Sequence, residues 1–325
     1  MELQTVMPQN NLAEEVIETS SGLSFLEANT IVMPLEEIKS NHIIPVFVKD
    51  NETTISHVEF IETMFDVAKD YFNTETLLRP NIRVSHPIKG RIPEARNKAA
   101  KELLDGEKTL YYERMAFLIE IPHLFRKING NDVALVVGGV KALNEDNLYN
   151  KKGSAEHFKI FIGFQNRVCL NLKIWTDGLK ADVRVTNTID LSTEIYKLIA
   201  GFQAEKQLED MERLCSLYLS TSQFAHLIGR AKLYQHLPIE EKKHLPVLMY
   251  GDYQLSSIAE GYYHNDAFRR DSKGNISLWN VYNLLTGANK SSYIDKFLER
   301  GANASGFISE IGNAIDSNTP TWFLE

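Results

Sequence analysis

The residues with the clearest chemical potential form a basic tract between positions 83 and 98. The tract holds five cationic side chains and one acid, and cations gathered on one segment can neutralise nucleic-acid phosphates. Two prolines and a glycine predict that much of it is loop. The cations are Arg83, Lys89, Arg91, Arg96 and Lys98. The alternative is a solvated loop balanced by an acidic helix expected at 57–72.

Further cations of the predicted meander could extend this basic area, namely Lys151, Lys152, Lys159, Arg167, Lys173 and Arg184, and one strand there has a mixed face. Along segment 167–175, alternation places Arg167, Cys169, Asn171, Lys173 and Trp175 on one face. The indole of Trp175 offers a stacking surface for bases, and the loop cations Lys151 and Lys152 lie upstream. The alternative is that a second layer covers this face and that Cys169 is a buried thiol.

The two cysteines, Cys169 and Cys215, show no CxxC spacing and no paired histidines. This argues against a structural zinc site or a disulfide framework and fits a reducing cytosol. No catalytic motif is recognisable, so no catalytic residue, metal ligand or cofactor is predicted. An enzyme of unfamiliar type would need a cleft that joins Cys169, Asn171 and a histidine with a perturbed pKa.

Two further segments suggest ligand chemistry and have simpler explanations. Segment 287–292 differs from a phosphate-binding loop, because Asn289 stands where a glycine must precede the lysine. Ser292 and Asp295 there predict a helix cap. Trp279 and the residues that follow it at helical spacing could read bases, but such a stripe more often packs against another helix.

Charge is distributed unevenly along the 325 residues, whose net charge is −8. Segments 1–40, 41–80, 81–190 and 191–325 carry −6, −4, +5 and −3. The acidic total therefore does not exclude a polyanionic partner. No apolar run approaches the roughly 20 residues that span a bilayer, and the first residues lack an export-signal pattern. We expect a cytoplasmic protein without a membrane partner.

The pattern of elements predicts an α+β fold with flanking helices around an antiparallel β-meander in the first half, and a helical second half. We expect a loose acidic arm at 1–40 that includes a short ordered piece at 31–38, an α+β domain at 41–190 and a helical domain at 191–325 packed on it. Ser56 with Glu59, and Ser220 with Gln223, have capping-box spacing. Asn129-Gly130 predicts a turn between two strands. Other predicted elements are a strand at 43–48 and helices at 93–104, 191–219, 255–263, 278–286 and 293–298.

Several phrases of the sequence resemble a known family. They are Ser85–Arg96, Tyr111–Phe117, Gly138–Val140, Phe161–Cys169, Phe224–Gly229 and Trp279–Asp295. Together they resemble the domain of unknown function 3871 family of Bacteroidetes proteins over roughly residues 40–325, with the arm before residue 40 outside. The resemblance implies a mobile-element or accessory-genome setting, and it transfers no catalytic residue.

The leading hypothesis is a nucleic-acid-binding protein that handles single-stranded DNA in a mobile-element setting. Its contacts would be the tract cations, together with Lys151, Lys152, Arg167, Lys173 and Trp175. The alternative is a protein-interaction or adaptor module, which predicts an exposed apolar or mixed patch that pairs with another chain. An acidic arm that folds back on the tract would compete with a polyanion.

Overall fold

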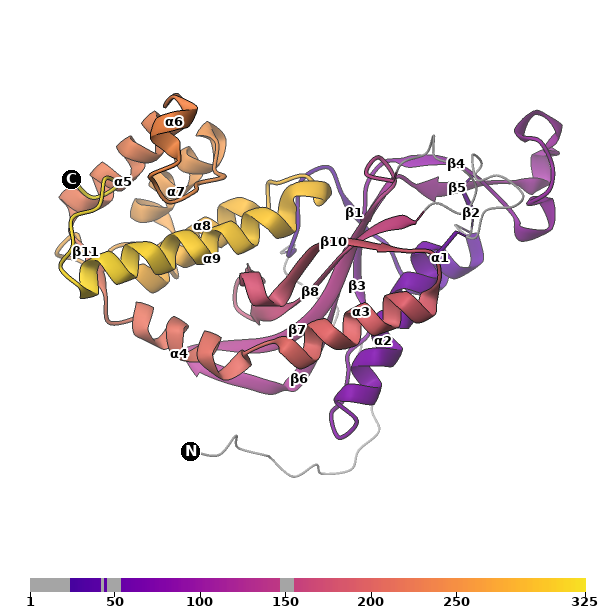
Figure 1. Cartoon of the computed structure of the whole chain (residues 1–325), viewed down its shortest axis with the longest axis horizontal. Helices are drawn as coiled ribbons and strands as arrows, with labels where there is room; N and C mark the ends of the chain where they lie inside the picture. Colours follow the sequence, from indigo (N-terminus) through magenta and orange to yellow (C-terminus); the bar gives the residue numbers. More distant parts are fainter. Residues whose placement is uncertain (1–23, 42–43, 46–53, 147–154) are drawn as a thin grey trace.

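The chain folds as an antiparallel sheet followed by helices (Figure 1). The structure is a computed structural model and describes residues 24–41, 44–45, 54–146 and 155–325. The predicted α+β class, with the sheet in the first half and helices in the second, is confirmed. Within the described residues, no helix is both long enough and apolar enough to span a bilayer.

A long hairpin forms the centre of the sheet. Its strands are β6 (Arg114–Ile128) and β7 (Asn131–Ala142). Asn129 and Gly130 connect them with φ values of 46° and 80°, a left-handed conformation that Asn and Gly adopt more readily than other residues. The turn predicted from this dipeptide is therefore confirmed.

The remaining strands extend the sheet on both sides of the hairpin. In spatial order the strands are β1 (Ile31–Val32), β3 (Asn81–Val84), β6, β7, β8 (Glu156–Asn166) and β10 (Leu179–Val185), with β9 (Leu172–Lys173) paired to β8. The strand predicted at 167–175 is wrong except for β9. Leu170 has a φ of 56°, which breaks the extended backbone and with it the alternation expected there.

Helices cover both faces of this sheet. On one face lie α2 (His57–Tyr71) and α3 (Thr188–Gly201), and on the other lies α9 (Ile294–Asp316). Side chains along β6 point alternately to the two faces and so contribute to two apolar cores. Phe117 packs into the first core, which includes Phe60 of α2, and Leu118 packs into the second core, which includes Phe297 of α9. Figure 1 shows α9 and the α2–α3 pair on opposite sides of the strands.

Two glycines in β7 allow close approach to the sheet. A Cβ atom at Gly139 would lie 2.3 Å from the Phe60 ring of α2, and one at Gly138 would lie 2.1 Å from the Phe117 carbonyl oxygen. Phe60 also packs edge-on against Phe117 and Phe158, at 5.0 and 4.9 Å between ring centroids. The missing side chain at Gly139 therefore lets α2 seat an aromatic ring directly on the strands.

The N-terminal segment is more ordered than predicted. Phe25 and Leu26 are buried in the second core, β1 pairs with β3, and α1 (Leu35–Asn41) follows. The short ordered piece expected at 31–38 within the loose acidic arm is confirmed by β1 and α1, whereas the burial of Phe25 and Leu26 was not predicted. Residues 1–23 lie outside the described part of the chain. The burial could not be predicted because these few apolar residues pack on distant elements and leave no periodic signal.

The second half is helical, as predicted. Its other helices are α4 (Ala204–Leu214), α5 (Thr221–Tyr234), α6 (Ile239–Lys242), α7 (Asp252–His264) and α8 (Leu278–Asn289), and β11 (Tyr218–Leu219) pairs with β12 (Ile276–Ser277). The helical segment predicted at 191–219 forms two helices, α3 and α4, because Phe202 and Gln203 leave helical geometry between them.

The helix caps are confirmed at two predicted positions and wrong at a third. Ser56 and Ser220 each form the complete capping box. The cap predicted from Ser292 and Asp295 is wrong, since α9 begins after Tyr293, which makes no side-chain cap. Ser292 instead donates to the Asn289 side chain at 2.7 Å.

One apolar core joins the two halves of the chain. It includes Phe158 of β8 together with Trp279 of α8. The buried surface of the sheet and that of the helices are therefore continuous. The division into domains at residue 190 stays a prediction.

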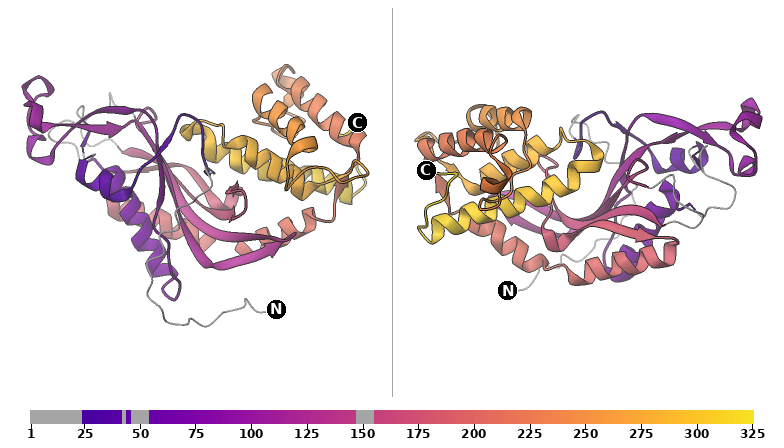
Figure 2. Two further views of the ribbon diagram at one scale, coloured as in Figure 1. Left: turned by 180° about the vertical axis from the view of Figure 1, so that it is seen from behind. Right: turned by 45° about the horizontal axis from the view of Figure 1, so that its top comes forward.

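A small three-stranded sheet supports a projection that we call the finger, residues 86–112. Its strands are β2 (Ile44–Pro45), β4 (Pro87–Arg91) and β5 (Lys108–Tyr112), and between β4 and β5 lie the 3-10 turns η1 (Pro93–Ala95), η2 (Ala100–Glu102) and η3 (Asp105–Glu107). The finger extends away from the rest of the molecule in each view (Figures 1 and 2). Of the strand predicted at 43–48, residues 44–45 form β2, and residues 43 and 46–48 lie outside the described residues.

Candidate functional site

Arg91 of the basic tract has a structural use. It is 3% exposed and donates to the carbonyl oxygens of Ala95, Arg96 and Lys98 at 3.3, 2.9 and 2.6 Å. A helix at 93–104 would need these same oxygens for its own hydrogen bonds. The guanidinium therefore favours the 3-10 turns over the predicted helix and loop, and both of those predictions are wrong for most of the tract.

Other predicted cations have partners within the protein. Arg83 on β3 donates to the side chain and the carbonyl of Thr30 at 3.0 and 2.9 Å, and burial lowers its pKa. Lys98 pairs with Glu107 and lowers the pKa of that carboxyl. Arg167 contacts the Glu120 carboxylate at 2.6 Å.

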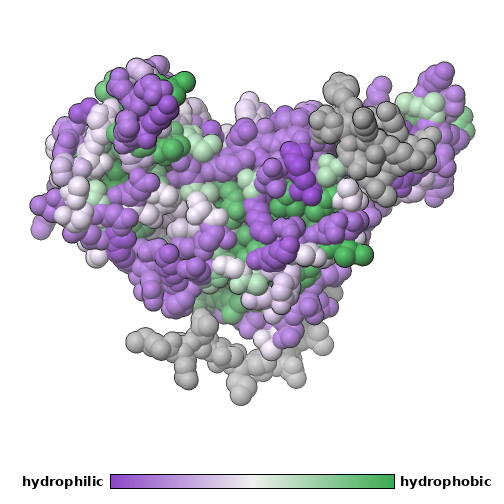
Figure 3. Space-filling view, viewed as in Figure 1, coloured by the Kyte–Doolittle hydropathy of each residue, from purple (hydrophilic) through white to green (hydrophobic). Residues whose placement is uncertain are grey.

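The ten predicted nucleic-acid residues do not share one surface. Lys173 is fully buried and Trp175 is 7% exposed, so neither can contact a strand of nucleic acid. Lys89 and Arg96 lie on the finger, exposed and half-buried respectively. Lys151 and Lys152 lie outside the described residues. Figure 3 shows the finger, at the upper right, as hydrophilic with a small hydrophobic patch.

A second candidate site is a buried polar layer between the β8–β9 connection and α8. Asn171 donates from Nδ2 to the Asn283 carbonyl oxygen at 2.8 Å, and Lys173 donates to Asn283 Oδ1 at 2.8 Å. Asn283 in turn donates to the Trp279 carbonyl oxygen. All of these side chains are nearly inaccessible to solvent, and such layers are costly unless their groups are satisfied.

An open cavity of about 390 Å³ adjoins this layer, and we call it the Lys290 cavity. Residues from four separate regions line it, among them Glu27, Cys169, Asn171, Asn283 and Lys290, with Glu260, Gly261, His264, Asn265, Phe268, Leu284, Gly287 and Ala288. The backbone N–H groups of Glu27 and Ala28 donate to the Lys290 carbonyl oxygen at 2.9 and 3.2 Å. The N-terminal segment therefore forms one wall.

The cavity brings together three residue types that an enzyme would use. Cys169 and Asn171 come from the β8–β9 connection, and His264 comes from the end of α7. No hydrogen bond joins the Cys169 thiol to His264 within the described part of the chain. Nucleophilic catalysis needs such a base, so the arrangement supports a binding site better than a catalytic one.

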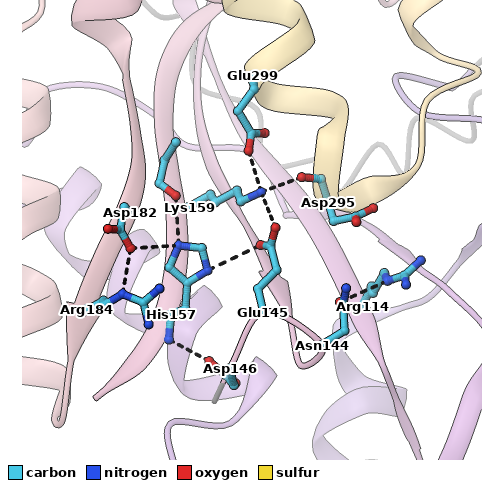
Figure 4. Close-up of polar contacts among 11 residues, drawn as sticks. Arg114, Asn144, Glu145, Asp146, His157, Lys159, Asp182, Arg184, Asp295 and Glu299 are labelled. Carbon is cyan, nitrogen blue, oxygen red and sulfur yellow. Dashed lines mark hydrogen bonds and ion pairs between the residues drawn. The ribbon is translucent and has the colours of Figure 1, made fainter. Parts of the chain in front are cut away.

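A third cluster is an ion network at the junction of β8, β10 and α9 (Figure 4). The ammonium of Lys159 contacts the carboxylates of Glu145 and Glu299 at 2.9 and 2.6 Å. His157 lies 3.4 Å from Glu145 and 3.3 Å from Asp182. Each cation is matched by carboxylates, and Glu299 belongs to α9, so the network holds that helix against the sheet.

The pKa values of this network predict a window of maximal stability. Burial alone would raise the pKa of Glu145, but hydrogen bonds from His157 and Lys159 lower it to about 2. The hydrogen bond to Glu145 raises the pKa of His157 above 6.5 despite burial. The Glu145 contribution is lost as pH falls from 4.5 toward about 2, and the His157 contribution is lost as pH rises through its folded value.

We expect Glu145→Gln to lower the unfolding temperature most between these limits, at about pH 5 to 6, and little at about pH 2. Thermal unfolding from acid to mildly alkaline pH measures this. Glu94→Gln, at an exposed position on the finger, is the matched control and should leave the profile unchanged. A loss that is the same at every pH would contradict the assignment.

Comparison with family models gives one match over nearly the whole chain. The family is described as "Domain of unknown function, B. Theta Gene description (DUF3871)", and its model matches residues 6–324. The chain belongs to this family. The DUF3871 match begins at residue 6, so the expectation that residues before 40 lie outside the family is wrong. No curated protein and no solved structure matches the chain.

Three of the six phrases that carry the DUF3871 resemblance fall at two places of chemical interest in the fold. Ser85–Arg96 forms one side of the finger, whereas Phe161–Cys169 and Trp279–Asp295 meet at the polar layer and the Lys290 cavity. Cys169, Asn171 and Lys290 have separate signals in the sequence, whereas Glu27, Glu260 and His264 were not predicted. These three residues have no distinguishing sequence pattern, because only the tertiary fold brings them to the cavity.

Proposed function

We propose that this DUF3871 protein binds nucleic acid through phosphate contacts made by the finger. The observation that carries the proposal is that part of the basic tract stands off the body of the protein on the finger. Lys89 and Lys101 are exposed there and Arg96 is half-buried. Cations on a projecting element can reach a phosphate backbone without rearranging the fold.

The mode of binding differs from the sequence hypothesis. Buried Trp175 removes the stacking contact on which a preference for single strands depended. Phosphate contacts alone are independent of base sequence. With about three such contacts, affinity for a single strand should fall roughly twentyfold between 50 and 200 mM salt.

We expect Lys89→Glu combined with Lys101→Glu to weaken binding at least about tenfold at low salt. Arg91 is unsuitable for this test because its guanidinium orders the finger. Fluorescence anisotropy with a labelled oligonucleotide, single-stranded and duplex, measures the affinity. The control carries the same charge change at Lys206 and Lys232, which are exposed on α4 and α5. Equal losses in both variants, or none in either, contradict the proposal.

A protein partner is the second candidate, and one observation favours it. Leu104 and Leu110 on the same finger are 65% and 51% exposed. Glu94, Glu102 and Asp105 also lie there, and such a mixed surface suits a protein better than a polyanion. In the anisotropy experiment this reading predicts no affinity for either oligonucleotide, together with a stoichiometric protein partner that survives nuclease treatment.

A further inference from the structure

Four lysines are buried within the described residues, and they fall into two kinds. Lys141 pairs with the Glu156 carboxylate, and Lys159 contacts two carboxylates in the ion network. Lys290 lines the cavity and Lys173 lies in the polar layer that adjoins it. Both lack a carboxylate at such close range within the described part of the chain. Buried ammonium groups normally have close anionic partners.

Lys173 is surrounded by neutral groups. Its Nζ donates to Asn283 Oδ1 at 2.8 Å and lies 4.8 and 5.0 Å from the ring centroids of Trp279 and Tyr282. No carboxylate lies within 4 Å of it among the described residues. Burial lowers the pKa of Lys173 to about 8, and the positive charge of Lys290 adds to that effect. The charged form is therefore held at a cost that a nearby anion would reduce.

Lys290 lies between this layer and the open cavity. It is 6% exposed, donates to the Cys169 carbonyl oxygen, and is 3.9 Å from the Glu27 carboxylate. Burial lowers its pKa as well. An ammonium has three donors, so Lys290 can donate further hydrogen bonds to a group in the cavity. Lys290 thus presents a cationic donor to the cavity, and its ion pair with Glu27 is longer than a hydrogen bond.

The rest of the cavity wall limits what could fit. Asn171 and Asn283 present amides near the floor, and Phe268 and Leu284 provide apolar surface. Glu260 and His264 stand at exposed positions on α7. A volume of about 390 Å³ lies within the range of small-molecule sites. The carboxylates of Glu27 and Glu260 disfavour a ligand that is anionic throughout.

We propose that the Lys290 cavity binds a small molecule through one terminal anionic group, a carboxylate or a phosphate, placed beside Lys290 and close to Lys173. The anion supplies a negative charge at hydrogen-bonding distance from Lys290, closer than Glu27 at 3.9 Å, and the Asn171 amide in the cavity wall orients it. The rest of the ligand lies along Leu284 and Phe268 toward α7. This site is separate from the finger and does not depend on nucleic-acid binding.

The test uses acetate and inorganic phosphate as the two probes, with chloride at matched ionic strength as the reference. Calorimetry on the full chain measures binding, and we expect one probe to bind with a dissociation constant of about 1 mM or tighter. Cys169 lines the cavity and reports the location. The bound probe should slow alkylation of Cys169 by iodoacetamide and leave Cys215 unaffected, since burial raises the pKa of Cys215 to about 11.

Two pairs of variants test separately whether binding needs the positive charge of Lys290 and whether it needs the open volume of the cavity. Lys290→Met should weaken binding at least about tenfold, whereas Lys296→Met, at an exposed position on α9, should not. Gly287→Leu should fill the cavity while both lysines stay. Gly287→Ala is its control, because a Cβ atom there makes only ordinary contacts, at 3.6 and 3.8 Å to Asn171.

The outcomes distinguish the two ligand chemistries and can overturn the proposal. Protection by acetate alone assigns a carboxylate ligand, and protection by phosphate alone or by both assigns a phosphate-accepting site. If neither probe binds, the proposal is overturned. It is also overturned if binding survives unchanged in Gly287→Leu, since the anion then lies elsewhere. Should Lys290→Met fail to fold, the Gly287 pair still decides the question.

Discussion

Replacing Gly139 by alanine is expected to cost at least about 3 kcal/mol of unfolding free energy, or to prevent folding altogether. The added Cβ would lie 2.3 Å from the Phe60 ring and 2.8 Å from the Lys159 carbonyl oxygen. Phe60 is held between Phe117 and Phe158 and cannot turn aside. The strand and α2 must therefore move apart, which opens the first core. Urea unfolding monitored by circular dichroism measures the loss.

Gly306→Ala is the matched control for this substitution. Gly306 lies within α9, and nothing is within 4 Å of a Cβ atom added there. Because alanine is the better helix former, this variant should gain up to about 1 kcal/mol. A second substitution, Phe60→Leu, should recover part of the loss at Gly139 by removing the clashing ring atoms. If Gly139→Ala alone is as stable as the parent, this account of α2 packing is wrong.

Lys141→Met is expected to destabilise the protein by about 3–5 kcal/mol. The Lys141 side chain is fully buried, pairs with Glu156, and donates to the Ile55 carbonyl oxygen at 2.9 Å. Methionine fills the space, but it leaves the Glu156 carboxylate without its cation. That carboxylate is only 12% exposed to solvent. Burial already raises the pKa of Glu156, and Lys141 opposes that rise. Denaturant titration at neutral pH measures the effect.

The loss at Lys141 should depend on the charge of Glu156. Adding Glu156→Gln should restore more than half of the lost stability, because a neutral amide can still accept from Ile55 N. Acidification should also shrink the loss, since protonated Glu156 no longer needs a cation. Lys197→Met, which breaks an exposed pair with Glu194, should change stability by less than about 1 kcal/mol. A double variant no better than Lys141→Met would contradict the charge argument.

Local features of the fold could be predicted from the sequence where neighbouring residues decide them. The capping boxes at Ser56 and Ser220 and the Asn129-Gly130 turn depend on residues within one helical turn or one hairpin. The break at Leu170 could not be predicted in this way. A leucine at positive φ is uncommon, and the surrounding fold imposes it. The burial of Phe25 likewise depends on α9, which lies far along the chain.

The candidate sites were less predictable, because the charge of a side chain does not indicate whether the fold buries it or leaves it exposed. Arg91 and Lys89 are two residues apart, yet one is buried under three carbonyl oxygens and the other is exposed. Lys173 looked like a surface cation and lies in the core. The Lys290 cavity requires a segment near residue 27, the β8–β9 connection, α7 and α8 to meet. Such an arrangement has no signature in sequence spacing.

The placement of α9 has a consequence for biosynthesis. This helix covers the face of β6 and β7 that carries Leu118 and Val136, and it begins about 150 residues after β7 ends. A ribosome that adds roughly 5–20 residues per second needs about 8–30 s to cover that distance. During this interval the finished hairpin presents an apolar surface and an incomplete sheet to the cell. The emerging chain is therefore a natural client for chaperones, and most of its risk of aggregation falls before the last helix is made.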